Sequence, residues 1–388
     1  MQKFNPVNLR KFLMPELVFG NGARHLAGNY CRNFNIRKVL IVTDKKLAHS
    51  GLLNDVVDSI KNQYIEARVF SNVSPNPRDF EVMEGTDLYL QENCEAIVAL
   101  GGGSPMDCAK GIGIVSQNGG HILDYKGINR ISTTLPPMIF IPTTAGTSSD
   151  VSQFTIILDS TELIKIAIIS KVILPDISLI DPETTLSMGP YLTACTGMDA
   201  MTHAIEAFVS IANSPITDLH ALKAIETIDK ILPQVPEHMN NIQLREKIMF
   251  ASFEAGLAFS NAMLGAVHAM SHSLGGYLDL PHGECNSLLL EHVINFNYTV
   301  AEERFKKIAR TMEIPVTGLN SKEIKNKLFD HIQSLKLKLG ITKSLKDIGV
   351  TGSDIPILSQ KAKNDACLLT NPRNAELNDI RAIFEEAY

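Results

Sequence analysis

The stretch that decides the fold is residues 96–113, which read "AIVALGGGSPMDCAKGIG". Five apolar residues run together, glycines follow at 101–103, and residues typical of a helix start come directly after them. A short run that is apolar throughout is typical of a strand buried on both faces, as in a parallel sheet covered by helices. The glycines let the backbone approach an anion closely, and the helix directs free N–H groups at it. This order predicts an α/β sheet with a phosphate-binding turn, and a purely structural glycine turn is the alternative.

Three residues specify where the helix after the glycines starts. We expect Ser104 as the N-cap, Pro105 at the first helical position and Asp107 as the acid of a capping box. The G-x-G-x-x-G fingerprint of dinucleotide-binding folds is absent, because Met106 occupies its sixth position. The turn alone therefore indicates an anion site and does not identify a cofactor.

Short β-rich runs alternate with helical or polar stretches between residues 37 and 181, which predicts a Rossmann-like α/β domain with a parallel sheet. The runs are 38–44, 66–70, 96–103, 138–144, 154–159, 165–170 and 177–181. After Asp181 long stretches have helical periodicity, which predicts an all-α second domain. We expect a dinucleotide-binding domain at 1–185 and a helical domain for metal and substrate at 186–388.

Length and composition limit the class of protein. A chain of 388 residues exceeds the size at which one hydrophobic core stops growing, so two domains are expected. The net charge of −6 comes without a basic stripe, which argues against nucleic acid as a partner. No C-x-x-C pair, signal-like N-terminus or run of 18 apolar residues is present. We therefore expect a cytoplasmic protein with reduced thiols and no membrane partner.

Asp44 closes the β-rich run "KVLIVTD". A carboxylate at the C-terminal end of a strand can accept a hydrogen bond from a ribose 2′-hydroxyl and repel a 2′-phosphate, which favours NAD over NADP. In the usual fold, however, the acid follows the glycines by about 20 residues, and here it precedes them. A simple turn residue is the alternative.

Histidines are dense between residues 268 and 282, in "HAMSHSLGGYLDLPH". His268 and His272 are four residues apart, so their rings lie on one face of the expected helix. Asp199 and His203 repeat this spacing on another helix. Two such helices can bring a carboxylate and several imidazoles to one Fe²⁺, Zn²⁺ or similar divalent ion. The spacing selects this region and not the individual ligands, and surface or capping histidines are the alternative.

With these motifs the sequence resembles the iron-containing alcohol dehydrogenase family over nearly its whole length. The motifs that agree, in order, are "FGNGA" at 19–23, "GGGSPMDCAK" at 101–110, "IPTTAGTSSDVS" at 141–152, "KIAIIS" at 165–170, "LPD" at 174–176, "IDPE" at 180–183, "GMDAMTHAIEA" at 197–207, "GLAFSNAMLGAVHAMSHSLGG" at 256–276 and "PHGECN" at 281–286.

The resemblance implies an oxidoreductase that transfers hydride between NAD(H) and a small alcohol or aldehyde bound at a divalent metal, typically Fe²⁺, in a homo-oligomer. It makes His272 a catalytic residue that does not bind the metal, and it places Phe259 at the substrate channel. The implied metal ligands are Asp199, His203, His268 and His282. The candidates for the cofactor cleft are Asp44, Gly102, Gly103, Ser104, Asp107, Thr143, Thr144 and Lys165.

One departure from the family pattern lies in "GTSSDVS" at 146–152, where Ser148 stands in place of a glycine. That glycine can adopt a backbone angle that is costly for other residues, so cofactor affinity depends on how this loop accommodates the serine. Two alternative functions stay open: a polyol or hydroxyacid dehydrogenase or transhydrogenase on the same fold, and a nicotinamide-sensing protein without catalysis.

Overall fold

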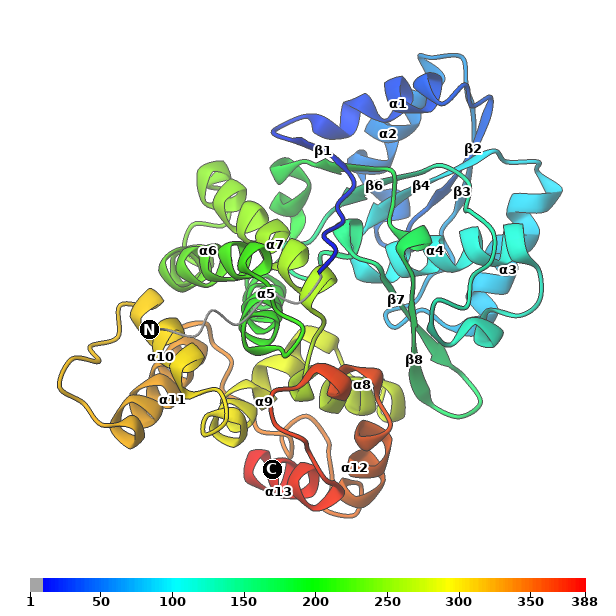
Figure 1. Ribbon diagram of the computed structural model, residues 1–388. Helices are drawn as coiled ribbons and strands as arrows, with labels where there is room; N and C mark the ends of the chain where they lie inside the picture. Colours follow the sequence, from blue (N-terminus) through cyan, green and yellow to red (C-terminus); the bar gives the residue numbers. More distant parts are fainter. Residues whose placement is uncertain (1–9) are drawn as a thin grey trace.

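The computed structural model describes residues 10–388 and shows an α/β half followed by a helical half (Figure 1). This confirms the predicted fold class. The α/β half is built on a six-stranded sheet in which all neighbouring strands are parallel. From edge to edge the strands are β1 (Glu16–Phe19), β9 (Ile177–Ile180), β6 (Met138–Pro142), β4 (Ala96–Gly101), β2 (Lys38–Val42) and β3 (Glu66–Phe70).

The centre of the sheet is buried on both faces. In β4, Ile97 and Ala99 belong to one apolar cluster, while Val98 and Leu100 belong to another on the opposite face. Helices cover each face of the sheet, and this explains why the run at 96–100 is apolar throughout, as we expect. The helices of the two clusters are α3 (Asp79–Gln91) with α4 (Gly103–Asn118), and α1 (Ala27–Asn33) with α2 (Gly51–Lys61).

Two of the runs that we expect in the parallel sheet form a separate hairpin. β7 (Phe154–Asp159) and β8 (Ile164–Ile169) pair antiparallel, and β5 (Gly127–Ile128) extends this hairpin to three strands. The expectation is wrong because only residues 160–163 connect β7 to β8, whereas a parallel connection needs a dozen or more residues. The edge strand β1 is an addition that the sequence pattern does not predict.

The helix after the glycine turn starts earlier than expected. α4 follows directly on Gly102, which is its N-cap without any side-chain cap. Ser104 and Pro105 therefore lie inside the first turn, where a proline costs little because N–H groups there have no acceptor within the helix. Asp107 does not close a capping box, and its Oδ1 instead accepts a hydrogen bond from Ser149 Oγ at 2.7 Å. The capping roles predicted for Ser104 and Asp107 are wrong, because the extended backbone of Gly102 starts the helix.

The helical half packs around one large apolar cluster. The proposed division at 185/186 falls in the 3₁₀ turn Pro182–Ser187, between β9 and the first long helix. The helices are α5 (Pro190–Val209), α6 (Pro215–Ile231), α7 (Ile242–Ala262), α8 (Ala266–Tyr277), α9 (His282–Asn297), α10 (Glu302–Thr311), α11 (Ser321–Lys338), α12 (Ile355–Lys363) and α13 (Leu377–Ala387).

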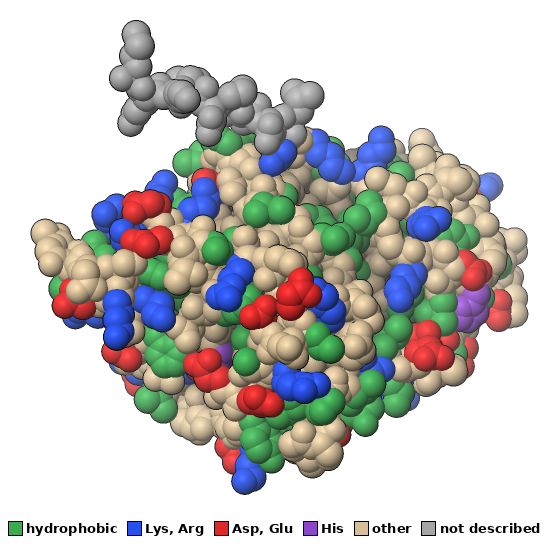
Figure 2. Space-filling model, turned by 60° about the horizontal axis from the view of Figure 1, so that its bottom comes forward, with side chains coloured by type: hydrophobic (Ala, Val, Ile, Leu, Met, Phe, Trp, Pro, Cys, Tyr) green, Lys and Arg blue, Asp and Glu red, His purple; other side chains and the backbone are tan. Residues whose placement is uncertain are grey.

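Within residues 10–388, no single helix has the length and hydropathy of a membrane span. α7 and α8 pass that test only as a pair, and they are bent by 100° at the break between them. On the face shown in Figure 2, acidic and basic side chains are interspersed. The prediction about the N-terminal segment falls partly on residues 1–9, which lie outside the described residues.

The order of the strands brings Asp44 and the glycine turn to the ends of neighbouring strands. The chain passes from β2 to β3 on one side and then returns to β4 on the other side of β2. Ligands of open α/β sheets bind at such a switch point, beyond the carboxyl ends of the strands. Asp44 follows β2 and the glycine turn follows β4, so both lie beyond the carboxyl ends of these two neighbouring strands, although their order in the sequence is reversed.

Candidate metal centre and cofactor cleft

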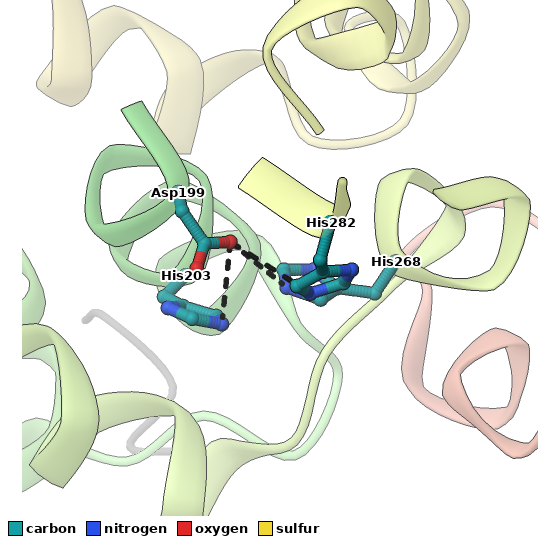
Figure 3. A group of neighbouring side chains, drawn as sticks. All are labelled: Asp199, His203, His268 and His282. Carbon is teal, nitrogen blue, oxygen red and sulfur yellow. Dashed lines mark ion pairs between the residues drawn. The ribbon is translucent and has the colours of Figure 1, made fainter. Parts of the chain in front are cut away.

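Asp199, His203, His268 and His282 point toward one another (Figure 3). Asp199 Oδ1 lies 3.8 Å from His203 Nε2, 3.9 Å from His268 Nε2 and 3.8 Å from His282 Nε2. One ligand atom from each of the four residues lies within 4.8 Å of all the others. Metal–ligand bonds of about 2.1 Å would separate tetrahedral donors by roughly 3.4 Å, so the group is close to the size that a divalent ion requires.

Three helices bring these side chains together. Asp199 and His203 are one turn apart on α5, His268 is on α8, and His282 is the first residue of α9. The start of α9 comes very close to α5, because a Cβ on Gly283 would lie 2.8 Å from the carbonyl oxygen of Cys195. A larger residue at 283 would push His282 away from the other donors.

A hydrogen bond at Nδ1, on the far side of the ring from Nε2, holds each imidazole in place. His203 Nδ1 lies 3.2 Å from Gly146 O, and His282 Nδ1 lies 3.1 Å from Ser271 Oγ. His268 Nδ1 lies 2.6 Å from the Glu206 carboxylate. Such partners fix the ring and leave Nε2 free to bind a metal.

The environment keeps these rings neutral. Burial lowers the pKa of His203 to about 4 and that of His268 to about 3, and it holds the pKa of His282 well below its usual range. Neutral imidazoles with one carboxylate form a donor set that binds Fe²⁺ or Zn²⁺ in proteins. The chemistry of these residues therefore fits a divalent ion.

Glu206 is a residue of the site that the sequence analysis missed. It is buried, and it also accepts hydrogen bonds from the backbone N–H groups of Gly265 at 3.0 Å and Val267 at 2.7 Å, at the start of α8. Burial raises the pKa of Glu206 to about 7. Its position on α5, three residues after His203, could have suggested that it faces the same site.

His272 has a separate anchor, which is also absent from the sequence prediction. Its Nδ1 lies 2.9 Å from Asp365 Oδ2, while Asp365 Oδ1 accepts the backbone N–H of Cys367 at 2.8 Å. The ring of His272 stacks on that of His282, with 5.4 Å between centroids. The Nε2 atom of His272 is thus left for other partners, beside the group of four candidate metal ligands. Asp365 is 93 positions away in the sequence, and no local pattern points to it.

One pocket connects the histidines of this group to the glycine turn before α4. Phe259 stacks on His203 with 4.3 Å between centroids and lines the same pocket. Burial lowers the pKa of Lys165, whose side chain also faces this pocket. The sequence-predicted residues that line it are Gly103, Ser104, Asp107, Lys165, His203, Phe259, His268, His272 and His282.

Four of the cofactor candidates lie outside that lining. Asp44 is partly exposed after β2, and its Oδ1 accepts N–H bonds from Lys46 at 2.8 Å and Leu47 at 2.9 Å. A Cβ on Gly102 would lie 3.1 Å from Thr144 Cγ2, so these two residues pack together. The fourth, Thr143, is buried beside Thr144 and donates its N–H to Gly101 O at 2.9 Å.

The loop that contains the departure is held by a buried lysine that the sequence analysis also missed. Lys110 Nζ donates to the carbonyl oxygens of Ser149, Ser152 and Phe154 at 2.7–2.9 Å. Burial lowers the pKa of Lys110 to about 8. Ser148 has φ +50°, as expected for a position that favours glycine, and its Oγ donates to Ser252 O at 2.7 Å. The loop therefore accommodates the serine with a compensating bond.

Comparison with known proteins shows which family the chain is similar to. The family models described as iron-containing alcohol dehydrogenase and as the C-terminal part of the Fe-containing alcohol dehydrogenase family match residues 15–182 and 193–388. The chain is 39% identical to 1,3-propanediol dehydrogenase of Klebsiella pneumoniae, over 97% of this chain and 98% of that one. It is 38% identical to NAD-dependent methanol dehydrogenase of Bacillus methanolicus, over 97% and 99%. The solved structure of an alcohol dehydrogenase from Oenococcus oeni superposes with a TM-score of 0.95 at 36% identity, over 98% and 100%.

Matches of this extent confirm the resemblance stated from the motifs. They cover both halves of the chain and nearly the full length of each relative. The chain is therefore an oxidoreductase that belongs to the iron-containing alcohol dehydrogenase family.

Proposed function

We propose that this chain transfers hydride between NAD(H) and a small alcohol or aldehyde, with one divalent ion bound by Asp199, His203, His268 and His282. The observation that carries the proposal is the convergence of four ligand atoms, three of them on histidines that line the pocket at the start of α4. The bound groups would supply two functions: Lewis acidity at the substrate oxygen, and a nicotinamide carbon that exchanges hydride.

The residues of the protein have three tasks in this reaction. The N-terminus of α4 offers Gly103 and Ser104 backbone N–H groups to the pyrophosphate. Phe259 and Leu264 give the pocket an apolar wall beside the ligand group. His272 takes up or delivers the proton, because Asp365 holds its Nδ1 and leaves Nε2 for transfer.

Two further proposals concern the identity of the native ion and of the nicotinamide cofactor. We propose Fe²⁺ because the matching family models are described as iron-containing. Zn²⁺ is the competing ion, because it also fits one carboxylate and three imidazoles and binds more tightly in most such sites. We propose NAD over NADP because Asp44 lies at the switch point of the sheet, where its charge opposes a 2′-phosphate.

A second candidate is a diol dehydrogenase on the same fold. It is favoured by the similarity to proteins named 1,3-propanediol dehydrogenase and, at 34% identity, lactaldehyde reductase of Escherichia coli.

A cytoplasmic location is proposed because all six cysteines are free and buried. A homo-oligomer is proposed from the family resemblance, and light scattering on the purified protein tests it.

The test combines metal analysis with a substrate panel. Purified protein should contain about one divalent ion per chain, and NADH absorbance should change with short alcohols, diols or aldehydes. Asp199→Ala should lose both metal and turnover. Asp229→Ala is the matched control, because Asp229 also pairs with a histidine, His331 at 2.7 Å, outside the pocket. Full activity of metal-free protein would contradict the proposal, and bound metal and cofactor without turnover would favour the sensing alternative.

A further inference from the structure

Asn286 lies among the proposed metal ligands without being one of them. Its side chain is fully buried on α9, one helical turn after His282. Asn286 Nδ2 donates to Asp199 Oδ1 at 2.6 Å, and it lies 3.1 Å from His268 Nε2 and 3.2 Å from His282 Nε2. One amide group thus contacts three of the four ligand atoms.

The other end of the same amide has no partner. Asn286 Oδ1 is buried, and no hydrogen bond reaches it from any part of the chain that the structure describes. Burying an acceptor without a donor costs free energy, so leucine would fill this space more favourably if packing were the only requirement. The NH₂ end must therefore be the part that the protein uses. A flipped amide would set Oδ1 against the Asp199 carboxylate, acceptor against acceptor.

We propose that Asn286 is a positioning residue of the metal site, which fixes the Asp199 carboxylate by hydrogen bonding and thereby raises the affinity for the divalent ion. This rests on the proposed function, because it assumes that the four-residue group binds an ion. A carboxylate oxygen carries two lone pairs, so Asp199 Oδ1 can accept from Asn286 and still bind a metal. An imidazole Nε2 has only one lone pair, so a bound ion uses the lone pairs of His268 and His282. Of the three contacts of Asn286 Nδ2, only the hydrogen bond to Asp199 then remains.

The affinity for the metal should therefore depend on the NH₂ group of Asn286. Without Asn286, Asp199 is free to rotate, and binding must then order it. Asn286→Leu, which keeps the branched shape of the side chain and removes the donor, should weaken the binding of Zn²⁺ by about 10- to 100-fold. Asn286→Asp also removes the donor but adds a negative charge beside the ion, so it should lose less affinity than the leucine variant.

Asn297 provides the matched control on the same helix. It is also buried, and its amide pairs with that of Asn371 at 2.8–2.9 Å, with no contact to the four ligands. Asn297→Leu should lower the Tm of the metal-free protein and leave the Zn²⁺ dissociation constant within about twofold of wild type.

The experiment is a competition titration with a zinc chelator, together with the Tm of each metal-free protein. Wild type that binds no Zn²⁺ or Fe²⁺ at the four-residue group would remove the proposed function itself. Wild type that binds while Asn286→Leu binds equally well or more tightly would overturn this inference alone. Weaker binding in Asn286→Leu, with Asn297→Leu unchanged, would support it.

Discussion

His272 and Asp365 form a buried pair, with 2.9 Å between Nδ1 and Oδ2, although 93 positions separate them in the sequence. The pair lies beside the proposed ligand group and not within it, since Asp199 Oδ1 has its three short histidine contacts with His203, His268 and His282. The proposed function therefore gives proton transfer and metal binding to different histidines.

His272→Ala should separate these two roles. Turnover should fall by about 10²- to 10⁴-fold, the usual contribution of a general acid or base. The metal content should stay at the wild-type value, because the four proposed ligands remain. Elemental analysis and steady-state kinetics measure both quantities. If the variant loses its metal, His272 is a ligand and the assignment is wrong.

Asp365→Asn tests the positioning of the histidine. The amide oxygen can still accept the N–H of Cys367, so the local fold should survive. The amide can, however, present its NH₂ group to His272 and favour the wrong tautomer. We expect kcat to fall by about 10- to 100-fold while the KM for NADH stays within about twofold, a smaller effect than removal of the base itself. An equal loss through KM would indicate a structural role instead.

The sequence predicts what depends on local pattern. The run at 96–100 predicts a strand buried on both faces. Its side chains alternate between two apolar clusters, so none of its positions faces water. The i, i+4 rule finds Asp199 with His203, and the same rule applied to His282 would have found Asn286. The short segment 160–163 would likewise have excluded a parallel β7/β8 pair, had its length been used.

What the sequence cannot supply depends on packing between distant elements. Nothing near Asp365 indicates that α8 will lie beside it. The start of α4 could not be located to the residue, because Gly102 caps the helix through its backbone and not through a side chain. Individual metal ligands required the family resemblance, since His272 has the same spacing to His268 that His203 has to Asp199.

Asp107 should give stability a measurable pH dependence. Burial raises its pKa from 3.8 to about 6. A group with a raised folded-state pKa stabilises the fold below its unfolded pKa, and this contribution is lost as the pH rises through the folded pKa. Asp107→Asn cannot titrate. The free energy of unfolding of the variant minus that of wild type should therefore rise between about pH 4 and 6, by up to about 3 kcal/mol. Urea titrations at several pH values test this, and parallel curves would contradict it.

Asp44 has two possible roles that two variants can separate. Asp44→Ser removes the charge but keeps an acceptor for the N–H groups of Lys46 and Leu47, whereas Asp44→Ala removes both. Both variants should raise the ratio of NADPH to NADH efficiency by about 10- to 100-fold, or roughly 1.4–2.7 kcal/mol. Only the alanine variant should also lose about 1 kcal/mol of stability. Unchanged cofactor preference in both would leave Asp44 as a turn residue alone.

Ser148 and Gly256 should show energetic coupling. A Cβ on Gly256 would lie 2.5 Å from Ser148 Cβ and 2.6 Å from Val151 Cγ2. Gly256→Ala should therefore destabilise the protein by about 1–3 kcal/mol through overpacking. Ser148→Gly relieves the strain of a positive φ but loses the bond to Ser252 O, so its own effect should stay within about 1 kcal/mol.

In the double variant the loss should be smaller than the sum of the two single effects, by about 0.5–2 kcal/mol, because the contact with Ser148 is gone. Recovery should be partial, since Val151 still crowds the new methyl group. Additivity within about 0.5 kcal/mol would show that the serine is accommodated independently of Gly256. Because Lys110 holds the loop through carbonyl oxygens that neither change removes, the NADH dissociation constant of Ser148→Gly should remain within about twofold of wild type. The serine would then be a tolerated replacement that leaves cofactor binding intact.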